Sequence, residues 1–291
     1  MEITEKAAAK LNLCLDTPFR HSDGSLEWKM VMTAIDLADY VHIQTVTNTN
    51  EISVQTDNGF LPCDHRNLTY QAAHKIKQLF HIKTGLKISI KKNIPVAAGM
   101  GGGSADAAAV LRALNQLWQL HLSQAELAAI GLSIDSDVPF CIYSEPALVT
   151  GRGEKVTPLG PLPNMWFVVA KPPASVSTPT ILKQVDHAEF QHLDVDSVVT
   201  GIKQQDLAMI TANMGNVLEN LTTKRYPDIA RIKNKMLQFG TQTALMSGTG
   251  PTVYGVCQNY SRAVHVYNSL RGFCKEVYLV SPYTLPTSQQ K

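Results

Sequence analysis

Residues 99–103 place four glycines in five positions, immediately before a segment whose apolar residues recur at helical spacing. Because glycine loses more backbone freedom on folding than any other residue, the cluster favours a place where something approaches the bare backbone closely. Ser104 stands where a helix N-cap is expected, and Asp106 falls in the predicted first turn. Converging N–H groups at a helix N-terminus bind anions such as phosphate. We therefore predict a phosphate-binding loop, with a flexible turn as the alternative interpretation.

Other phosphate-binding patterns fit this loop less well. A Walker A loop needs a Lys followed by Ser or Thr after its glycines, and none follows here. The spacing Gly99-x-Gly101-x-x-Ser104 comes near the dinucleotide fingerprint, which continues into a second strand, whereas here the pattern predicts a second helix. The His-Arg-Asp and Asp-Phe-Gly motifs do not occur in the sequence, which excludes the ordinary protein kinases.

The elements that must position this loop follow from hydrophobic periodicity and capping residues. Ser123 and Glu126 have the spacing of a capping box at the start of a helix over 123–132. The remaining patterns predict strands at 6–15, 30–46, 86–94, 166–172 and 252–258, and helices at 67–85, from the glycines to 118, at 206–227 and at 226–240. Strands and helices mixed without strict alternation predict an α+β fold in both halves of the chain.

Composition and charge bound the class of protein. Of the 291 residues, 44% are apolar and 17% are charged, which is typical of a globular protein. With 26 basic and 24 acidic side chains the net charge is +2, so nothing points to nucleic acid or a membrane surface as a partner. The scattered cysteines, five in number, are read as reduced thiols. We expect a cytoplasmic protein with a small-molecule substrate, present as a monomer or a weak homodimer.

The stretch 158–165 is dense in Pro and Gly and marks the expected domain boundary. We accordingly predict one domain over 1–160, with the phosphate-binding loop, and a second over 161–291. His187 and His192 lie in a polar stretch of the second domain, where we expect an exposed loop and not a metal site.

The residues of the loop resemble a known family. PVAAGMGGGSADAA, at 95–108, is similar to the phosphate-binding motif of the GHMP kinases, named for galactose, homoserine, mevalonate and phosphomevalonate kinases. KAAAKLNLCLD, at 6–16, resembles the N-terminal signature of the branch acting on 4-diphosphocytidyl-2-C-methyl-D-erythritol. IDSDVPFCI, at 134–142, resembles the segment with that branch's catalytic aspartate, and SGTGPTVYGV, at 247–256, resembles the family's C-terminal glycine motif. The four motifs occur in the family's order over nearly the whole chain.

This resemblance implies a fold and an activity. The expected fold is the two-domain GHMP kinase fold, with an N-terminal domain like domain 2 of ribosomal protein S5, a ferredoxin-like C-terminal domain, and the active site in the cleft between them. The implied activity is transfer of the γ-phosphoryl group of ATP to the 2-hydroxyl of 4-diphosphocytidyl-2-C-methyl-D-erythritol, in the non-mevalonate route to isoprenoid precursors. ATP and Mg²⁺ are the implied cofactors.

The resemblance also implies roles for individual residues. Asp137 is expected to take the proton of the acceptor hydroxyl, and Lys10 is its cationic neighbour, which favours the ionised carboxylate. Asn67 matches a position that contacts the nucleotide base, although an Asn before a helix is also a common cap. The segment expected to wrap the ATP phosphates consists of Pro95, Val96, Ala97, Ala98, Gly99, Met100, Gly101, Gly102, Gly103, Ser104 and Ala105. Ser104 is also a candidate contact for Mg²⁺ or the β-phosphate, with a plain N-cap as an equally good account of it, and we assign no metal ligands.

Asn12, two residues from Lys10 on the same strand face, is expected to line the substrate site. Gly248 and Gly250 are expected to shape the second wall of the cleft, with a tight turn as the alternative reading.

The chain departs from its branch where the acceptor's cytosine is read. The branch carries Asp-Gly-Tyr-His where residues 23–26 read DGSL, so Ser25 and Leu26 replace an aromatic ring and an imidazole. A second aromatic position is matched by Leu182. Stacking of a base on an aromatic side chain is worth about 1–3 kcal/mol. Trp28 is a candidate replacement for one face, or else a core residue.

Two other functions therefore stay open at this point. One is a kinase of the same fold that acts on another alcohol, because the cytosine-reading residues are altered. The other is a nucleotide-binding protein without catalysis, against which the retained Lys10 and Asp137 argue, since a binder needs neither.

Overall fold

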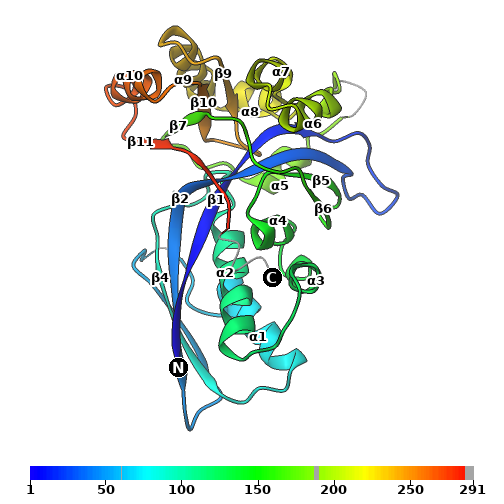
Figure 1. Ribbon diagram of the computed structural model, residues 1–291, viewed down its shortest axis with the longest axis vertical. Helices are drawn as coiled ribbons and strands as arrows, with labels where there is room; N and C mark the ends of the chain where they lie inside the picture. The colour runs from blue at the N-terminus through cyan, green and yellow to red at the C-terminus, as the bar shows by residue number, and fades with distance from the viewer. Residues whose placement is uncertain (60, 187–189, 286–291) are drawn as a thin grey trace.

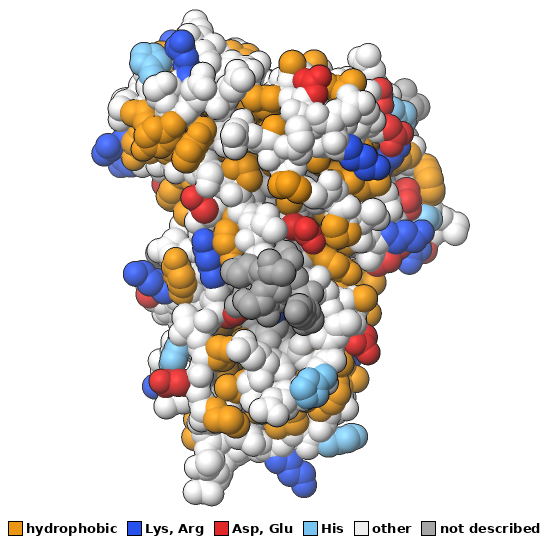
Figure 2. Space-filling model, in the orientation of Figure 1, with side chains coloured by type: hydrophobic (Ala, Val, Ile, Leu, Met, Phe, Trp, Pro, Cys, Tyr) orange, Lys and Arg blue, Asp and Glu red, His pale blue; other side chains and the backbone are white. Residues whose placement is uncertain are grey.

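The computed structural model describes residues 1–59, 61–186 and 190–285. These residues form two sheets, one of eight strands with the central order β3-β4-β2-β1-β8 and one of four strands with the order β11-β7-β10-β9. No helix within the described ranges is long and apolar enough to cross a membrane. On the face drawn in Figure 2, acidic and basic side chains are interspersed, in line with the small net charge.

Two long strands, β1 (Glu2–Asp16) and β2 (Trp28–Val46), form the spine of the molecule and run along its long axis (Figure 1). They pair antiparallel from Glu2 opposite Gln44 to Asp16 opposite Lys29. Residues 7–16 of β1 are all buried, because helices cover one side of the strand and the second half of the chain covers the other. The register shifts between Ala8 and Lys10 and again between Asn12 and Cys14.

The rest of the first sheet comes from short strands. They are β3 (Ile52–Thr56), β4 (Gly85–Lys91), β5 (Ala147–Gly151), β6 (Lys155–Pro158), β8 (Gly215–Asn216) and β12 (Pro282–Tyr283). β4 and β5 pair with β2, β8 pairs parallel with β1, and β12 pairs with β2. β8 and β12 are therefore strands that the second half of the chain contributes to the sheet of the first half.

Helices α1 (Leu68–Leu79), α2 (Gly102–Leu117), α3 (Gln124–Leu132) and α4 (Val138–Tyr143) lie together on one face of this sheet (Figure 1). Ser123 and Glu126 form the predicted capping box of α3. The core of α2 is rich in alanine, which lets the helix lie close to β1 and α1. The predicted helix at 67–85 ends earlier, because the chain reverses after Phe80 to reach β4.

The second sheet consists of β7 (Trp166–Lys171), β9 (Thr243–Met246), β10 (Val253–Cys257) and β11 (Glu276–Val280). It is accompanied by α9 (Pro227–Gln238) and α10 (Tyr260–Leu270), and the loops also carry α5 (Thr178–Leu182), α6 (Val195–Lys203), α7 (Leu207–Asn213) and α8 (Glu219–Arg225). The mixed α+β architecture in both halves confirms the predicted fold class. All four strands of this sheet follow residue 160, which agrees with a division at 160/161. However, β8 and β12 also follow residue 160 and pair with strands of the first half. The boundary itself stays a proposal.

The predicted single helix over 206–227 is wrong. The chain leaves α7 at Asn213, forms the two-residue strand β8 and then starts α8. Gly215 packs so closely against Leu193 that a Cβ there would lie 2.8 Å from its side chain. The break allows Cys14 and Leu15 of β1 to pair with β8.

All five cysteines are free thiols, as predicted, and only Cys63 is exposed. Burial raises the pKa of the Cys14 thiol to about 12, so it is not a ready nucleophile.

Candidate active site

A cavity of about 640 Å³ lies between the two halves of the chain. Its walls come from β1, β2, the glycine-rich loop, the start of α4, α5 and the loop between β9 and β10. Two glycine loops meet there, because Ser247 Oγ donates a hydrogen bond to the carbonyl oxygen of Gly99 at 3.0 Å. The predicted cleft between the halves is therefore present, and most of the predicted site residues line it.

Lys10 and Asp137 face each other in this cavity. Lys10 Nζ lies 3.3 Å from Asp137 Oδ2 and donates a hydrogen bond to Asn12 Oδ1 at 2.9 Å. The Lys10 side chain is 6% exposed and that of Asp137 is 29% exposed, so the acid is the more accessible partner. The register shifts of β1 flank Lys10 and Asn12, and such irregularities redirect side chains locally. Lys10 is thus no surface charge, and Asp137 makes no side-chain cap of α4.

The glycine-rich loop turns directly into α2 over this pair. Gly101 is the N-cap of α2 and has a φ of 66°, which favours glycine. A Cβ at this position would lie 2.9 Å from Cγ of Lys10. The loop is tied to β1, since the backbone N–H of Lys10 donates to the carbonyl oxygen of Met100 at 3.0 Å. Backbone N–H groups at the start of a sixteen-residue helix therefore face the cavity beside the Lys10–Asp137 pair.

Ser104 is not the N-cap that the sequence predicted, and Asp106 lies past the first turn. The cap falls three residues earlier because the glycines themselves enter the helix. Ser104 Oγ instead donates to Asp135 Oδ1 at 2.8 Å, and the same oxygen accepts from the backbone N–H of Asp137 at 3.0 Å. Ser104 and Asp135 line the cavity, whereas Ala105 is buried and does not. The predicted cofactor contact of Ala105 is therefore corrected.

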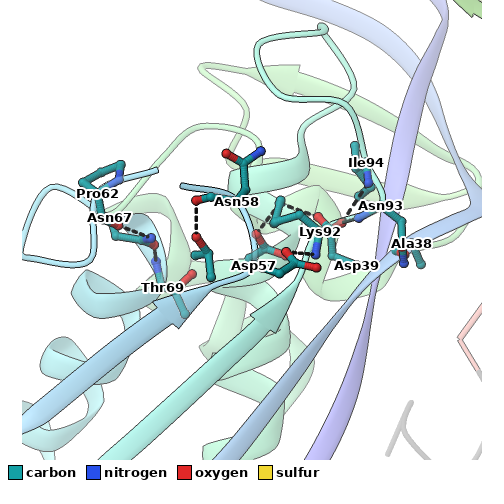
Figure 3. Close-up of polar contacts among 12 residues, drawn as sticks. Ala38, Asp39, Asp57, Asn58, Pro62, Asn67, Thr69, Lys92, Asn93 and Ile94 are labelled. Atoms are coloured by element: carbon teal, nitrogen blue, oxygen red, sulfur yellow. Dashed lines mark hydrogen bonds and ion pairs between the residues drawn. The ribbon is translucent and has the colours of Figure 1, made fainter. Parts of the chain in front are cut away.

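The end of the cavity toward α1 contains Asn67 and Pro62 (Figure 3). Asn67 caps α1, with its Oδ1 accepting from the backbone N–H of Thr69 at 2.9 Å, and its Nδ2 donates to the carbonyl oxygen of Pro62 at 2.8 Å. The cap was the alternative interpretation of this residue. One amide hydrogen and one lone pair of the side chain remain unused by these two bonds.

Beneath the loop, the cation Lys92 forms a buried cluster with two acids, Asp39 and Asp106; Figure 3 shows Lys92 beside Asp39. Lys92 Nζ binds Asp39 and also Asp106, the latter at 2.6 Å. Burial opposes the charged form of Lys92, but Asp106 and Asp39 outweigh it and raise the pKa of Lys92. Burial raises the pKa of Asp106. Lys92 acts in the opposite direction, whereas the second acid, Asp39, adds to the increase. Asp39 also accepts from the backbone N–H groups of Asn93 and Ile94, so the cluster anchors the chain entering the loop.

The second glycine loop forms the opposite wall. Gly248 lines the cavity, and a Cβ there would lie 3.5 Å from Lys10 Nζ. Gly250 does not line it, because a Cβ on Gly250 would point at Met246, 2.6 Å from its sulfur. The predicted substrate contact of Gly250 is therefore corrected to a turn role. Sequence reasoning missed Asn216, whose Nδ2 donates to the carbonyl oxygens of Met246 and Gly248 at 2.8 Å each.

Two of the predicted acceptor-reading positions, Ser25 and Leu26, are not among the residues that line the cavity. Leu26 is 6% exposed and belongs to the hydrophobic core, and the Ser25 hydroxyl donates to Asp23 at 2.6 Å. Neither residue lines the cavity, because the chain makes a tight turn over 21–25 before β2. Leu182 does line it, as does Trp28, which is also packed against the core.

His192 lies in an exposed loop, as predicted, with its ring beside Asp16 at 3.0 Å, and His187 lies outside the described residues. Across the described ranges, no group of three His, Cys, Asp or Glu side chains is placed to hold a metal ion. Further polar residues line the cavity that sequence reasoning did not assign: Arg66, Lys92, Asp106, Asp135, Ser136, Arg152, Thr178 and Thr249. The signal for Asp135 was its place two residues before Asp137.

Two family models match the chain. The model for the N-terminal domain of GHMP kinases matches residues 67–145, and the model for their C-terminal domain matches residues 198–276.

Curated relatives match over nearly their whole length. The 4-diphosphocytidyl-2-C-methyl-D-erythritol kinase of Ligilactobacillus salivarius is 66% identical over 96% of this chain and 97% of its own. The protein of the same name from Lactiplantibacillus plantarum is 59% identical over 98% of this chain and 99% of its own.

Solved structures agree with these matches. A crystal structure of 4-(cytidine 5'-diphospho)-2C-methyl-D-erythritol kinase superimposes with a TM-score of 0.81 at 28% identity, over 96% of this chain and 99% of that one. Homoserine kinase from Cytophaga hutchinsonii, 20% identical, superimposes with a TM-score of 0.79 over 97% of this chain and 95% of its own, and its likeness concerns the fold alone.

Proposed function

The chain belongs to the GHMP kinase family, and on that premise we infer that it is an ATP-dependent kinase of 4-diphosphocytidyl-2-C-methyl-D-erythritol. The reaction transfers the γ-phosphoryl group of ATP to the 2-hydroxyl of this acceptor, in the non-mevalonate route to isoprenoid precursors. Relatives of this name at 55–66% identity support the acceptor. The observation that carries the chemistry is the Lys10–Asp137 pair beneath the start of α2.

Phosphoryl transfer needs a proton acceptor, a positioned phosphate chain and stabilisation of charge. In our proposal Asp137 accepts the proton of the acceptor hydroxyl, the freed oxygen attacks the γ-phosphorus, and the bond to the β-phosphate oxygen breaks to release ADP. Lys10 stands 3.3 Å from Asp137 and offsets the negative charge that develops on the attacking oxygen. Asn12, which accepts from Lys10 Nζ at 2.9 Å, holds this ammonium toward the cavity.

The nucleotide is proposed to bind with its phosphates against residues 95–104. The N–H groups at the start of α2 and the loop at Gly99 and Gly101 offer donors without side chains in the way. Asn67 is proposed to contact the base with its remaining amide capacity.

Oxygen donors suited to Mg²⁺ are present beside the loop. Mg²⁺ is typically held by one or two side-chain oxygens together with substrate phosphates. Ser104 Oγ and the Asp135 carboxylate lie together in the cavity and fit that description, and we propose that they would hold the ion. Mg²⁺ bound there supplies charge neutralisation for the nucleotide phosphates.

The alternative of a different alcohol loses part of its basis. Ser25 and Leu26, two of the three residues that motivated it, lie away from the cavity. A noncatalytic binder is disfavoured by the buried Lys10 facing Asp137, an arrangement that binding alone does not require.

The test is a coupled ADP-release assay with purified protein, ATP, Mg²⁺ and 4-diphosphocytidyl-2-C-methyl-D-erythritol. We expect turnover that depends on this acceptor, with homoserine and mevalonate as control acceptors that give none. A folded protein that binds ATP but releases no ADP in the presence of the acceptor would reject the proposed function.

A further inference from the structure

Arg112 is a buried cation within α2, about three helical turns beyond the N-cap Gly101. Each of its three guanidinium nitrogens donates a hydrogen bond to a different residue. Nε donates to Oε1 of Glu5 at 2.8 Å. Nη1 donates to the carbonyl oxygen of Cys141 at 2.7 Å, and Nη2 donates to that of Lys6 at 3.0 Å. One side chain therefore joins α2 to both β1 and α4.

The two carbonyl groups belong to the segments that carry the proposed catalytic pair. Lys6 precedes Lys10 by four residues on β1. Cys141 follows Asp137 by four residues, and its backbone N–H donates to the carbonyl oxygen of Asp137 at 3.1 Å. Because a guanidinium is planar and rigid, the two outer nitrogens of Arg112 fix the distance between β1 and α4 at this point.

The short helix α4 depends on contacts from outside. It has six residues, and a helix of this length is not stable by itself in water. The last four carbonyl groups of a helix have no partner within the helix, and that of Cys141 is one of them. An Arg side chain at this end satisfies such a carbonyl and interacts favourably with the helix dipole. Arg112 thus holds the helix that begins directly after Asp137.

The strand β1 is irregular just where Lys10 must be placed. Its register with β2 shifts between Ala8 and Lys10, so the ladder alone does not fix the strand there. Arg112 holds the strand before the shift, at the carbonyl group of Lys6. After the shift, the backbone N–H of Lys10 donates to the carbonyl oxygen of Met100. The irregular stretch is therefore anchored on both sides.

Resting on the proposed function, we propose that Arg112 is a positioning residue that sets the distance between Lys10 and Asp137. It does not line the cavity, so it acts through these two residues and not on a substrate. It also belongs to the helix that starts at the glycine-rich loop. The buried Glu5 balances its charge, and the two carbonyl bonds carry the positioning.

The first test is Arg112→Lys, which keeps the positive charge beside Glu5 but replaces the planar fork with a single nitrogen. One ammonium group cannot reproduce the bonds to both carbonyl groups at the fork's spacing. We expect kcat to fall about 10- to 100-fold, because a catalytic group displaced by about 1 Å loses its alignment. The KM values for ATP and for the acceptor should stay close to those of the natural protein.

Two controls separate positioning from loss of stability. Glu5→Gln removes the charge of the ion pair and keeps an oxygen that can accept from Arg112 Nε. Val266→Ala opens space in the core beneath α10, on the second sheet. Both variants should melt at a lower temperature and keep their kcat at an assay temperature well below melting. A fall in kcat that follows the melting temperature across all of these variants would overturn the proposal.

A double variant keeps the test decisive if Arg112→Lys does not fold. Arg112→Met combined with Glu5→Gln leaves no unpaired buried charge, and such neutral replacements of buried ion pairs are commonly tolerated. It lacks both carbonyl bonds, so its kcat should fall as expected for Arg112→Lys. A folded double variant with the kcat of the natural protein would overturn the proposal.

A structural readout separates this inference from the proposed function. Crystal structures of the natural protein and the double variant give the distance from Lys10 Nζ to Asp137 Oδ2, which is 3.3 Å here. We expect it to change by roughly 0.5 Å or more, the tolerance within which catalytic groups must be held. An unchanged distance would overturn the positioning role. A changed distance in a protein that does not turn over the acceptor would support the positioning role while rejecting the proposed function.

Discussion

The two ends of the cavity are built from different chemical groups, backbone at one end and side chains at the other. At the end where we propose that the nucleotide binds, backbone groups of residues 95–104 and the start of α2 form the surface, with side chains such as Lys92 beneath it. At the end proposed for the acceptor, side chains of β1, β2 and α5 form the surface, among them Trp28 and Leu182. The first end is continuous in sequence, and the second is assembled from segments far apart.

This difference explains why one end of the cavity was easier to predict from the sequence than the other. A backbone-built site requires glycine at particular positions, and glycine clusters are visible in a sequence. A side-chain-built site depends on which residues a strand turns toward the cavity, and a tight turn before β2 moved Ser25 and Leu26 away from it while Trp28 stayed. In this proposal, specificity can therefore change at the acceptor end without any change in the glycine-rich loop.

The largest effect is expected at the residue where the two ends meet. Asp137→Asn removes the proposed proton acceptor while it keeps the shape of the side chain. Turnover should fall by roughly 10²–10⁴-fold, the usual contribution of general base catalysis, while ATP binding measured by calorimetry is retained. Asp228→Asn, at the exposed start of α9, is the control and should keep full activity. Survival of turnover in Asp137→Asn would show that another group takes the proton.

The backbone-built end can be broken by a single methyl group. Gly101→Ala places a Cβ 2.9 Å from Cγ of Lys10, at a φ of 66°, so the loop and the lysine must separate. We expect a loss of kcat/KM of ten-fold or more, because a catalytic group that shifts slightly loses its alignment.

Gly160→Ala is the matched control for this substitution. Gly160 has a similar φ of 84°, but nothing lies within 4 Å of its Cβ position. Both variants should lose about 1 kcal/mol of stability from the left-handed backbone, to which the contact with Lys10 adds in Gly101→Ala, and only Gly101→Ala should lose activity. Equal activities of the two variants would mean that the loop tolerates a side chain.

The smallest effect is expected from the cluster beneath the loop, and it depends on pH. The raised pKa of Asp106 means that the folded protein retains a proton which the unfolded chain releases above about pH 4. Stability linked to this group is therefore present at low pH and is lost as the pH rises. Relative to Asp106→Asn, which cannot titrate there, the melting temperature of the natural protein should fall between pH 5 and pH 9. Parallel melting curves over that range would contradict the assignment.

Much of the fold followed from local signals in the sequence. The strands at the start of the chain, the capping box at Ser123 and the turn from the glycine-rich loop into α2 all rest on residues close together in sequence. Lys10 and Asp137 came from resemblance, since no periodicity predicts that two residues 127 positions apart lie 3.3 Å from each other.

The elements that were predicted wrongly share one physical cause: contacts made in the folded protein outweigh the local sequence pattern. Residues 206–227 carry helical periodicity, yet Gly215 and Asn216 leave the helix to pair with β1 and to hold the second glycine loop. The Gly-Asn dipeptide was a turn signal inside the helical pattern. Ser104 was read as a cap from its type and its place after the glycines, whereas its hydroxyl donates to Asp135, on a segment that the helix meets only in the folded protein.

The return of β12 to β2 has a consequence for how the protein comes into being. Pro282 and Tyr283 lie opposite Ile35 and Ala34, so the sheet that contains β1 is completed only when β12 has been synthesised. While the chain is still emerging from a ribosome, that stretch of β2 has no cover on this side. A nascent chain halted shortly before residue 282 contains both glycine loops and Asp137, but its eight-stranded sheet still lacks β12.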